Sequence, residues 1–132
     1  MWGHYARSHS GFCLEFDTSF QPLRDKLRKV IYQTKMPRHE ASVKELGSRV
    51  DVTSFLLVKA REWKYEKEWR LLSEGFDVLL EYPPEALTAI YFGAKVSQDT
   101  LQQVTSVMNP ANTRPVQMKL ADDKFKLVEV DL

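Results

Sequence analysis

Short segments in which apolar and polar residues alternate with a period of two recur along this chain. The clearest is 12–16, where Phe12, Leu14 and Phe16 face one way and Cys13 and Glu15 face the other. Residues 116–120 and 125–130 alternate in the same way around a polar stretch, 121–124, which predicts a C-terminal hairpin. Since such alternation is typical of half-buried strands, the fold has to contain a sheet.

Helical spacing interrupts this strand pattern. Helices are predicted at 2–7, from Thr18 or Ser19 to Leu27, at 51–63, and from a Ser97 cap to Met108. Further strands are predicted at 28–33, 68–73, 77–82 and 88–92, with a loop at 35–40. About seven strands and three or four helices in mixed order indicate an α+β fold with a mixed, largely antiparallel sheet. The length of 132 residues suits a single domain over 1–132.

Composition excludes several classes of protein. With 43% hydrophobic and 28% charged residues, the chain has an ordinary globular profile. No apolar run approaches the roughly 20 residues of a membrane span, and Met1 is not followed by a basic and then an apolar stretch, so we expect neither membrane insertion nor a secretory signal. The one cysteine excludes an internal disulfide, which makes a reducing cytoplasm the expected location.

Charge is nearly balanced overall but uneven along the chain. There are 19 basic and 18 acidic residues, a net charge of +1, whereas 24–49 contains eight Lys and Arg against three acids. Such a segment could attract a phosphate-bearing ligand or an acidic partner, or form an ordinary solvated face. Because no aromatic ladder runs through it, nucleic-acid binding is not expected and is kept as a further alternative.

The first candidate site is the aromatic and histidine cluster Trp2, His4, Tyr5 and His9. His4 or Tyr5 could line a pocket and hold a ligand's polar groups; alternatively, Trp2 and Tyr5 pack in the core while a histidine bonds locally. Two histidines five residues apart do not share a helical face as zinc ligands do, so no metal site is predicted.

The second candidate site is the segment 63–70, WKYEKEWR. If extended, it presents Glu66, Glu68 and Arg70 on one face, where paired carboxylates could orient hydroxyl groups or activate a nucleophile. The alternative is a partly buried ion pair of these carboxylates with Arg70 or another cation. Trp63 and Trp69 are expected to be core or interface anchors.

Other reactive groups offer weaker patterns. Cys13 would need a histidine to lower its pKa, and nothing in the sequence fixes His4 or His9 beside it, so a small half-buried thiol is the simpler interpretation. Five glycines include no phosphate-binding loop or dinucleotide fingerprint.

Several motifs in combination resemble a known family. They are MWGHYA at 1–6, His9, GFCLEFD at 11–17, WKYEKEWR at 63–70 and IYFG at 90–93. Together they are similar to a widespread bacterial family of unknown function, the domain of unknown function twenty-nine seventy-one, which implies no assigned activity. Members usually carry a further N-terminal region, and this chain begins inside the first motif. Loss of that region would expose core surface or a sheet edge, so we expect a homodimer.

The family's layout also resembles that of ADP-ribosyltransferases, which bind NAD and use a late glutamate. That resemblance implies roles for Glu66, Glu68 and His4 as candidate catalytic residues. Because the early strand of such a site would lie in the missing region, we lean towards a protein that is not an enzyme and that needs no cofactor, with NAD kept for the alternative.

The expected function is that of a small cytoplasmic accessory or mobile-element protein that dimerises and binds a small ligand or a protein partner. The alternative is an ADP-ribosyltransferase-like NAD-binding protein of a toxin or phage-defence system. Both interpretations depend on one cavity shared by the two candidate sites. Its predicted ligand-binding residues are Trp2, His4, Tyr5, Glu66, Glu68 and Arg70.

Overall fold

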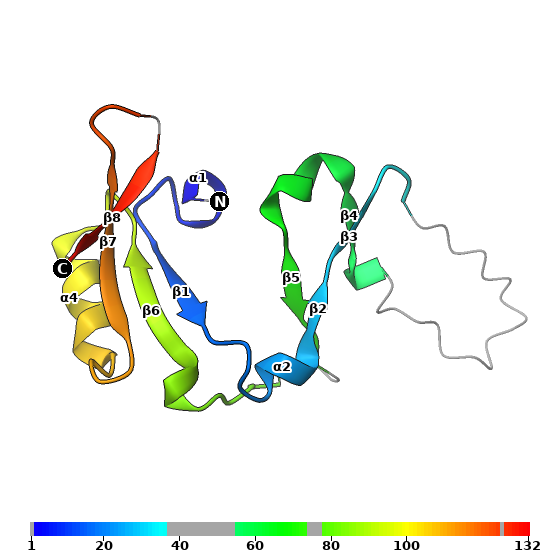
Figure 1. The fold of residues 1–132 in the computed structure, drawn as a ribbon, viewed down its shortest axis with the longest axis horizontal. Coiled ribbons are helices and arrows are strands. Elements are labelled where there is room, and N and C mark those ends of the chain that lie inside the picture. Colours follow the sequence, from blue (N-terminus) through cyan, green and yellow to red (C-terminus); the bar gives the residue numbers. More distant parts are fainter. Residues whose placement is uncertain (1, 37–54, 74–77, 125) are drawn as a thin grey trace, which may run out of the picture. The chain divides into compact units, whose positions relative to one another are not determined.

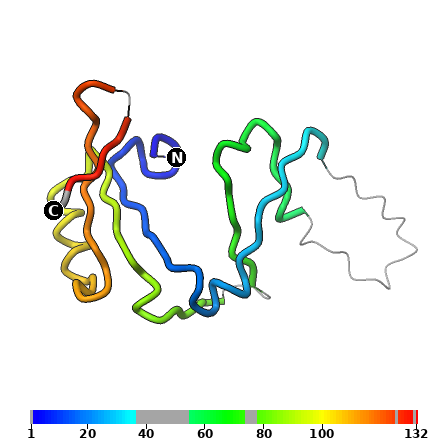
Figure 2. The backbone as a smooth tube through the Cα atoms, in the orientation of Figure 1, coloured from blue at the N-terminus to red at the C-terminus, as the bar shows by residue number. Residues whose placement is uncertain are grey.

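The computed structural model describes residues 2–36, 55–73, 78–124 and 126–132. The chain divides into two compact units: unit 1 consists of 1–24 and 80–132, and unit 2 of 25–79. Figure 2 shows that both ends of the chain, blue and red, belong to unit 1, while the middle forms unit 2. Each unit is described by itself below. That residues 1–132 form a single domain stays a prediction.

Unit 1 is built on a four-stranded mixed sheet (Figure 1). Its strand order is β1-β6-β7-β8, with β1 and β8 at the edges. β6 pairs antiparallel with β1 and parallel with β7, and β7 pairs antiparallel with β8. The bounds are Phe12–Phe16 for β1, Leu87–Phe92 for β6, Arg114–Leu120 for β7 and Leu127–Asp131 for β8. The predicted strands at 12–16 and 88–92 and the predicted C-terminal hairpin are confirmed.

A helical crossover joins the parallel strands β6 and β7, as parallel pairing requires. It contains α4, Gln98–Val107, which begins after Ser97. The Thr100 backbone N–H donates to Ser97 Oγ at 3.1 Å, so Ser97 caps the helix as predicted. The helix ends at Val107, one residue before the predicted end at Met108. A short 3₁₀ helix, η3, Pro84–Ala86, leads into β6.

The core of unit 1 lies at the two central strands. Phe92 in β6 and Val116 in β7 are both fully buried. Edge strands have a neighbour on one side only, and Phe12 and Leu14 of β1 remain 43% and 40% exposed. The apolar face of β1 is therefore only half covered.

Unit 2 contains two small sheets. In the first, β2, Leu27–Lys29, pairs antiparallel with β5, Trp69–Leu71. In the second, β3, Ile31–Gln33, pairs parallel with β4, Val58–Ala60, which continues into the 3₁₀ helix η2, Arg61–Glu66. Val30 lies between β2 and β3, is 2% exposed, and donates its N–H to Glu68 O at 3.1 Å. The short helix α2, Leu23–Lys26, precedes β2.

The α+β class is confirmed, with the strands of the described segments distributed over three sheets. The prediction of one helix over 51–63 is wrong at 58–60, which is strand β4. Residues 55–56 are helical, 61–63 lie in η2, and residues 51–54 lie outside the described part. Pairing with β3 overrides the helical spacing at 58–60, and Ile31 N–H donates to Leu57 O at 2.7 Å.

Other predicted boundaries also change. The strand predicted at 28–33 is divided at the buried Val30 into β2 and β3. The strand predicted at 77–82 is absent from its described part, 78–82, where Leu79 is 94% exposed and has no neighbouring strand to pair with. Residue 77 and residues 37–40 of the predicted loop lie outside the described part.

Of the helix predicted at 2–7, residues Trp2–Tyr5 form α1, and a strained turn that begins before Arg7 connects it to β1. Arg7, Ser8 and His9 all have positive φ angles, of 45°, 55° and 73°. The turn is closed when Gly11 N–H donates to Ala6 O at 3.0 Å. Non-glycine residues in this left-handed region cost about 1–3 kcal/mol each, so surrounding contacts must hold the turn.

Gly93, directly after β6, supplies those contacts. Its N–H donates to Gly11 O at 2.9 Å, and Lys95 N–H donates to His9 O at 2.8 Å. A Cβ at position 93 would lie 2.2 Å from His9 O, which no side chain can accommodate. Glycine at 93 therefore permits the turn to lie directly on the end of β6.

Gly93→Ala is expected to destabilise the protein by roughly 1–3 kcal/mol, because the added methyl group has to displace the turn. The matched control is Gly3→Ala in α1, where a Cβ meets nothing within 4 Å. It should be neutral or stabilising. Urea denaturation of both variants measures the difference, and equal midpoints would contradict this account of the turn.

Candidate functional site

The predicted carboxylate pair lies within a network of ion pairs in unit 2. Lys59 Nζ contacts Glu66 Oε2 closely and lies 2.9 Å from Glu68 Oε2. The other Glu68 oxygen, Oε1, accepts from Arg70 Nε at 2.7 Å. The Glu66 side chain is only 4% exposed, and that of Glu68 is 27% exposed. The structure thus brings Glu66, Glu68 and Arg70 together, around a lysine that the sequence analysis did not select.

A sharp turn allows two carboxylates on different elements to reach the same lysine. Glu66 ends η2, Lys67 follows with a left-handed φ of 48°, and Glu68 precedes β5. The Glu68 backbone N–H donates to Tyr32 Oη at 2.7 Å, which fixes the start of β5. The Lys59 ammonium also lies 5.2 Å from the centre of the Trp63 ring.

The electrostatics of this network are those of a structural element. Hydrogen bonds from Arg70 and then Lys59 hold the pKa of the Glu68 carboxyl below its ordinary value. The negative charges of the two carboxylates are matched by the positive charges of Lys59 and Arg70. The structure contains the ion pairs with Arg70 and with a second cation that the alternative interpretation expects, and a ligand-binding role for these residues stays a prediction. Trp63 and Trp69 are 37% and 57% exposed, so they are not core residues, and their role as interface anchors stays a prediction.

The first candidate cluster, in unit 1, separates into a stacked pair and an exposed pair. Trp2 stacks on His9, with ring centroids 6.4 Å apart and planes 9° from parallel. His9 Nδ1 is buried and has no hydrogen-bond partner in the structure as described. His4 and Tyr5 are exposed, Tyr5 by 65%, so the expectation that Tyr5 packs in the core is wrong.

Tyr5 lines a cavity of about 500 Å³ within unit 1. One wall is the turn from α1 to β1, and the other is the segment from Lys95 to the start of α4. The lining residues are Tyr5, Ala6, Arg7, Ser10, Gly11, Phe12, Lys95, Ser97 and Thr100. Two cations and four hydroxyl groups therefore surround one hollow, and neither cation pairs with a carboxylate of the described residues.

Arg7, Lys95, Ser10, Ser97 and Thr100 were not among the residues predicted to bind a ligand. The sequence does contain a signal for Lys95. It lies between Gly93, which ends a buried strand, and the helix cap Ser97, so a cation is expected beside the start of a helix, where anions bind. Arg7 had no such signal, because it reaches the cavity only through the left-handed turn.

The two predicted groups lie in different units. Trp2, His4 and Tyr5 belong to unit 1, and Glu66, Glu68 and Arg70 belong to unit 2. The cavity of 500 Å³ is lined by residues of unit 1 alone. A cavity shared by both groups stays a prediction.

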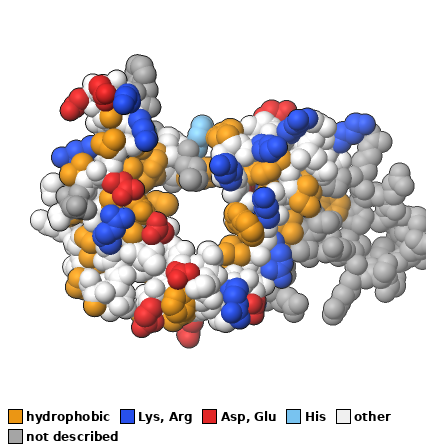
Figure 3. Space-filling view, viewed as in Figure 1, with side chains coloured by type: hydrophobic (Ala, Val, Ile, Leu, Met, Phe, Trp, Pro, Cys, Tyr) orange, Lys and Arg blue, Asp and Glu red, His pale blue; other side chains and the backbone are white. Residues whose placement is uncertain are grey.

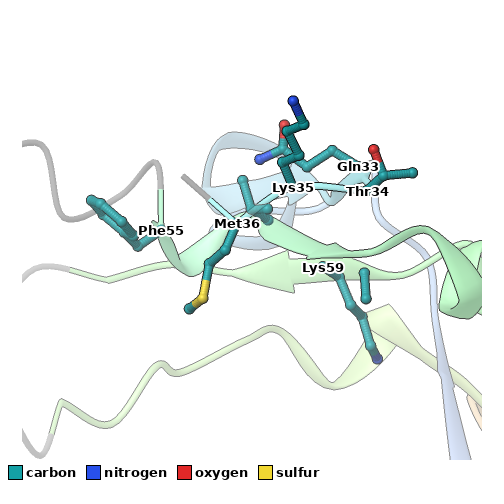
Figure 4. A pocket seen from close by; sticks show the side chains of 8 residues that line it. Gln33, Thr34, Lys35, Met36, Phe55 and Lys59 are labelled. Carbon is teal, nitrogen blue, oxygen red and sulfur yellow. The ribbon is translucent and has the colours of Figure 1, made fainter. Parts of the chain in front are cut away.

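A different cavity, of about 390 Å³, lies in unit 2 (Figure 4). Met36, Phe55 and Val58 give it an apolar lining, together with polar residues of 33–35 and with Lys59. Figure 4 shows Lys35 and Lys59 extending in opposite directions, and Lys59 is engaged by Glu66 and Glu68. No set of charged groups converges in this cavity from the described residues, in contrast to the cavity of unit 1.

A third polar group lies on the sheet of unit 1. Glu15 accepts from Thr88 Oγ1 at 2.7 Å and from Tyr91 Oη at 2.8 Å. A bulge between Glu15 and Phe16 sets Thr88 and Ala89 against one residue of β1, which brings the Thr88 hydroxyl to Glu15. These bonds lower the pKa of the Glu15 carboxyl, and the bond from Tyr91 to Glu15 raises the pKa of the Tyr91 phenol.

Cys13 pairs with Tyr91 across β1 and β6. Burial and then the Glu15 charge raise the pKa of its thiol. A raised pKa disfavours the thiolate, the form in which cysteine acts as a nucleophile. The residue as a whole is exposed and belongs to no disulfide. These surroundings favour the interpretation of Cys13 as an ordinary thiol.

The described residues of unit 2 are strongly basic in composition, with nine Lys and Arg against four Asp and Glu. Figure 3 shows lysine and arginine side chains, in blue, over much of the face of unit 2 that it presents. The described segments contain no cluster of three or more His, Cys, Asp and Glu side chains suited to a metal ion. No helix among them has the length and apolar character to span a membrane.

Comparison with known proteins gives the family. Residues 1–71, more than half of the chain, match the model of DUF2971, whose description is "Protein of unknown function". The chain therefore belongs to the DUF2971 family, as the motifs at 1–17 and 63–70 predicted. No curated protein and no solved structure shows significant similarity to it.

Glu66→Gln is expected to lower the free energy of unfolding by about 1–3 kcal/mol, because it removes the least exposed charge from Lys59. Glu62→Gln, at an exposed position of the same 3₁₀ helix, should change stability by less than about 0.5 kcal/mol. Chemical denaturation at pH 7 compares the two. Equal effects would contradict a structural role for the network.

The lowered pKa of Glu68 also predicts acid sensitivity. A carboxyl whose folded pKa lies below its unfolded value, about 4.3, contributes stability that is present above that value and is lost as pH falls through the folded pKa. Glu68→Gln should therefore be less stable than the parent at pH 7, and its stability should fall less between about pH 5 and pH 3. Denaturation midpoints across this range test it, with Glu62→Gln expected to keep the parent's slope.

Proposed function

We propose that this protein is a binding protein that holds a small phosphate-bearing ligand in the cavity of unit 1. The observation that carries the proposal is the convergence of Arg7 and Lys95 on one hollow, with no carboxylate among the described residues to neutralise them. Cations that face a cavity without a partner attract an anionic ligand, and arginine suits a phosphate group in particular.

The remaining lining groups complement such a ligand. The Thr100 hydroxyl can donate to a phosphate oxygen, whereas the Ser10 and Ser97 hydroxyls already donate to Arg7 O and Thr100 Oγ1. The start of the ten-residue helix α4 favours negative charge. Tyr5 and Phe12 offer exposed aromatic surface to an organic part of the ligand. The cavity thus combines a polar end with an apolar wall, as small-molecule sites commonly do.

The strained turn supports this assignment. Three successive left-handed residues, 7–9, place Arg7 at the cavity, and non-glycine residues in that conformation concentrate at functional sites. A relaxed connection from α1 to β1 would not need them. The energy that the turn stores is offset by its bonds to Gly93 and Lys95.

Binding is favoured over catalysis by the groups present. The cavity lining includes no carboxylate, histidine or cysteine to act as a general base or thiol nucleophile. In the alternative, an ADP-ribosyltransferase-like activity, Glu66 or Glu68 would have to act, and both are engaged by Lys59. We expect the protein to work in the cytoplasm, where its one thiol, Cys13, stays reduced.

Inorganic pyrophosphate should raise the melting temperature by on the order of 5 °C at saturation. Arg7→Gln and Lys95→Gln should each raise the pyrophosphate concentration needed for half of this shift at least tenfold, because each removes a charged hydrogen-bond donor. The control is Lys119→Gln, an exposed cation on β7 that does not line the cavity. A shift unaffected by the first two variants would contradict the proposal.

The same assay separates the alternatives. Stabilisation by NAD that depends on Glu68 as well as on Arg7 would favour the ADP-ribosyltransferase-like interpretation. Salt-sensitive retention on heparin that survives Arg7→Gln would instead favour an anionic polymer bound by the basic residues of unit 2.

A further inference from the structure

Strand β1 forms one edge of the unit 1 sheet, and its hydrogen-bond pattern shows which groups face outward. Gly93 N–H donates to Gly11 O, and Asp17 N–H donates to Ala86 O. Residues facing a partner alternate along an antiparallel strand, so Cys13 and Glu15 also direct their backbone groups to β6. The backbone groups of the intervening residues, Phe12, Leu14 and Phe16, therefore point away from the sheet.

Among the described residues, these outward groups have no backbone partner, and Leu14 O accepts only a long contact from Cys13 Sγ, at 3.8 Å. Neither the backbone bonds outside the strands nor any further interaction involves the N–H groups of Phe12, Leu14 or Phe16. Phe12 and Leu14 are 43% and 40% exposed, so water reaches the edge. An open edge with apolar side chains is a template for another strand.

The sequence of β1 is complementary to itself. If two copies pair antiparallel about Leu14, Leu14 faces Leu14 of the other copy, and Phe12 faces its Phe16. Glu15 then faces Cys13 instead of a second carboxylate. Its carboxylate is also held back towards β6 by Thr88 and Tyr91, at 2.7 and 2.8 Å. No pair of like charges is therefore set directly opposite across this edge.

The opposite edge of the sheet lacks this property. β8 runs over Leu127–Asp131, and Glu129 lies at its centre. Pairing of two copies about that centre would set Glu129 directly against Glu129, which is destabilising. Self-association through β8 is therefore disfavoured where β1 permits it.

We propose that two copies of this chain associate through β1, antiparallel and about a two-fold axis at Leu14. About six backbone hydrogen bonds would form between the outward groups, and the two sheets would become one. Because two five-residue strands bury less surface than a standard stable interface, the dimer should depend on protein concentration. The predicted homodimer thereby has a defined interface, which shares only Phe12 with the lining of the cavity in unit 1.

Site-specific crosslinking tests the register. In a Cys13→Ser background, Leu14→Cys should form a disulfide-linked dimer on mild oxidation, since paired Cα atoms lie about 5.5 Å apart and that spacing suits a disulfide. Phe12→Cys is the matched control, because it would face Phe16 of the other copy and not itself. Preferential crosslinking of Leu14→Cys supports the proposal, whereas equal crosslinking of both variants, or of neither, overturns it.

Sedimentation of the unmodified chain provides a second measurement that needs no cysteine variant. Its average mass should rise from monomer towards dimer between about 10 µM and about 1 mM. Leu14→Lys should remain a monomer over the same range, because it sets two ammonium groups opposite each other at the axis. Its melting temperature verifies that it folds. A parent chain that stays monomeric, or dimerises equally with Lys at 14, would overturn the interface.

Discussion

The close approach of two backbones at Gly93 is the constraint on which unit 1 depends. Because this position has no side chain, the turn after α1 can lie on the end of β6, with His9 O bonded to Lys95 N–H and Gly11 O to Gly93 N–H. Those bonds hold Arg7, Ser8 and His9 in left-handed conformations. They also set the start of β1 and bring Arg7 to the same hollow as Lys95. The sheet edge and the proposed ligand site thus share one structural cause.

Charge is used differently in the two units. In unit 2, Lys59 and Arg70 engage Glu66 and Glu68, which joins the turn before β5 to strand β4. In unit 1, Arg7 and Lys95 face a cavity without such compensation from the described residues. Paired charges stabilise a particular local structure, whereas unpaired charges that line a cavity attract a ligand of opposite charge. For this reason we place the binding site in unit 1.

Local patterns predicted local structure well. Alternation predicted β1 and the β7–β8 hairpin, and the Ser97 cap predicted α4, because these signals lie within a few residues of one another. The motifs predicted the family, DUF2971. Strand β4 was missed because three residues are too few to show a period, and its pairing with β3 comes from a distant part of the chain.

The sites were harder to predict for a related reason. Lys59 joins Glu66 and Glu68 only after a left-handed turn at Lys67, and Arg7 and Lys95 are 88 positions apart. The spacing of residues in the sequence does not show which distant side chains come into contact in the fold. The aromatic and carboxylate groups that the motifs suggested for one cavity belong to two units, and a cavity shared by them stays a prediction.

The most direct test of the central claim is a titration of the ¹⁵N-labelled protein with inorganic phosphate, followed by NMR. Saturable shifts confined to the amides of 5–12 and 93–100 would show the anion bound where Arg7 and Lys95 converge. Shifts that do not saturate, or that instead follow the basic residues of unit 2, would contradict the account.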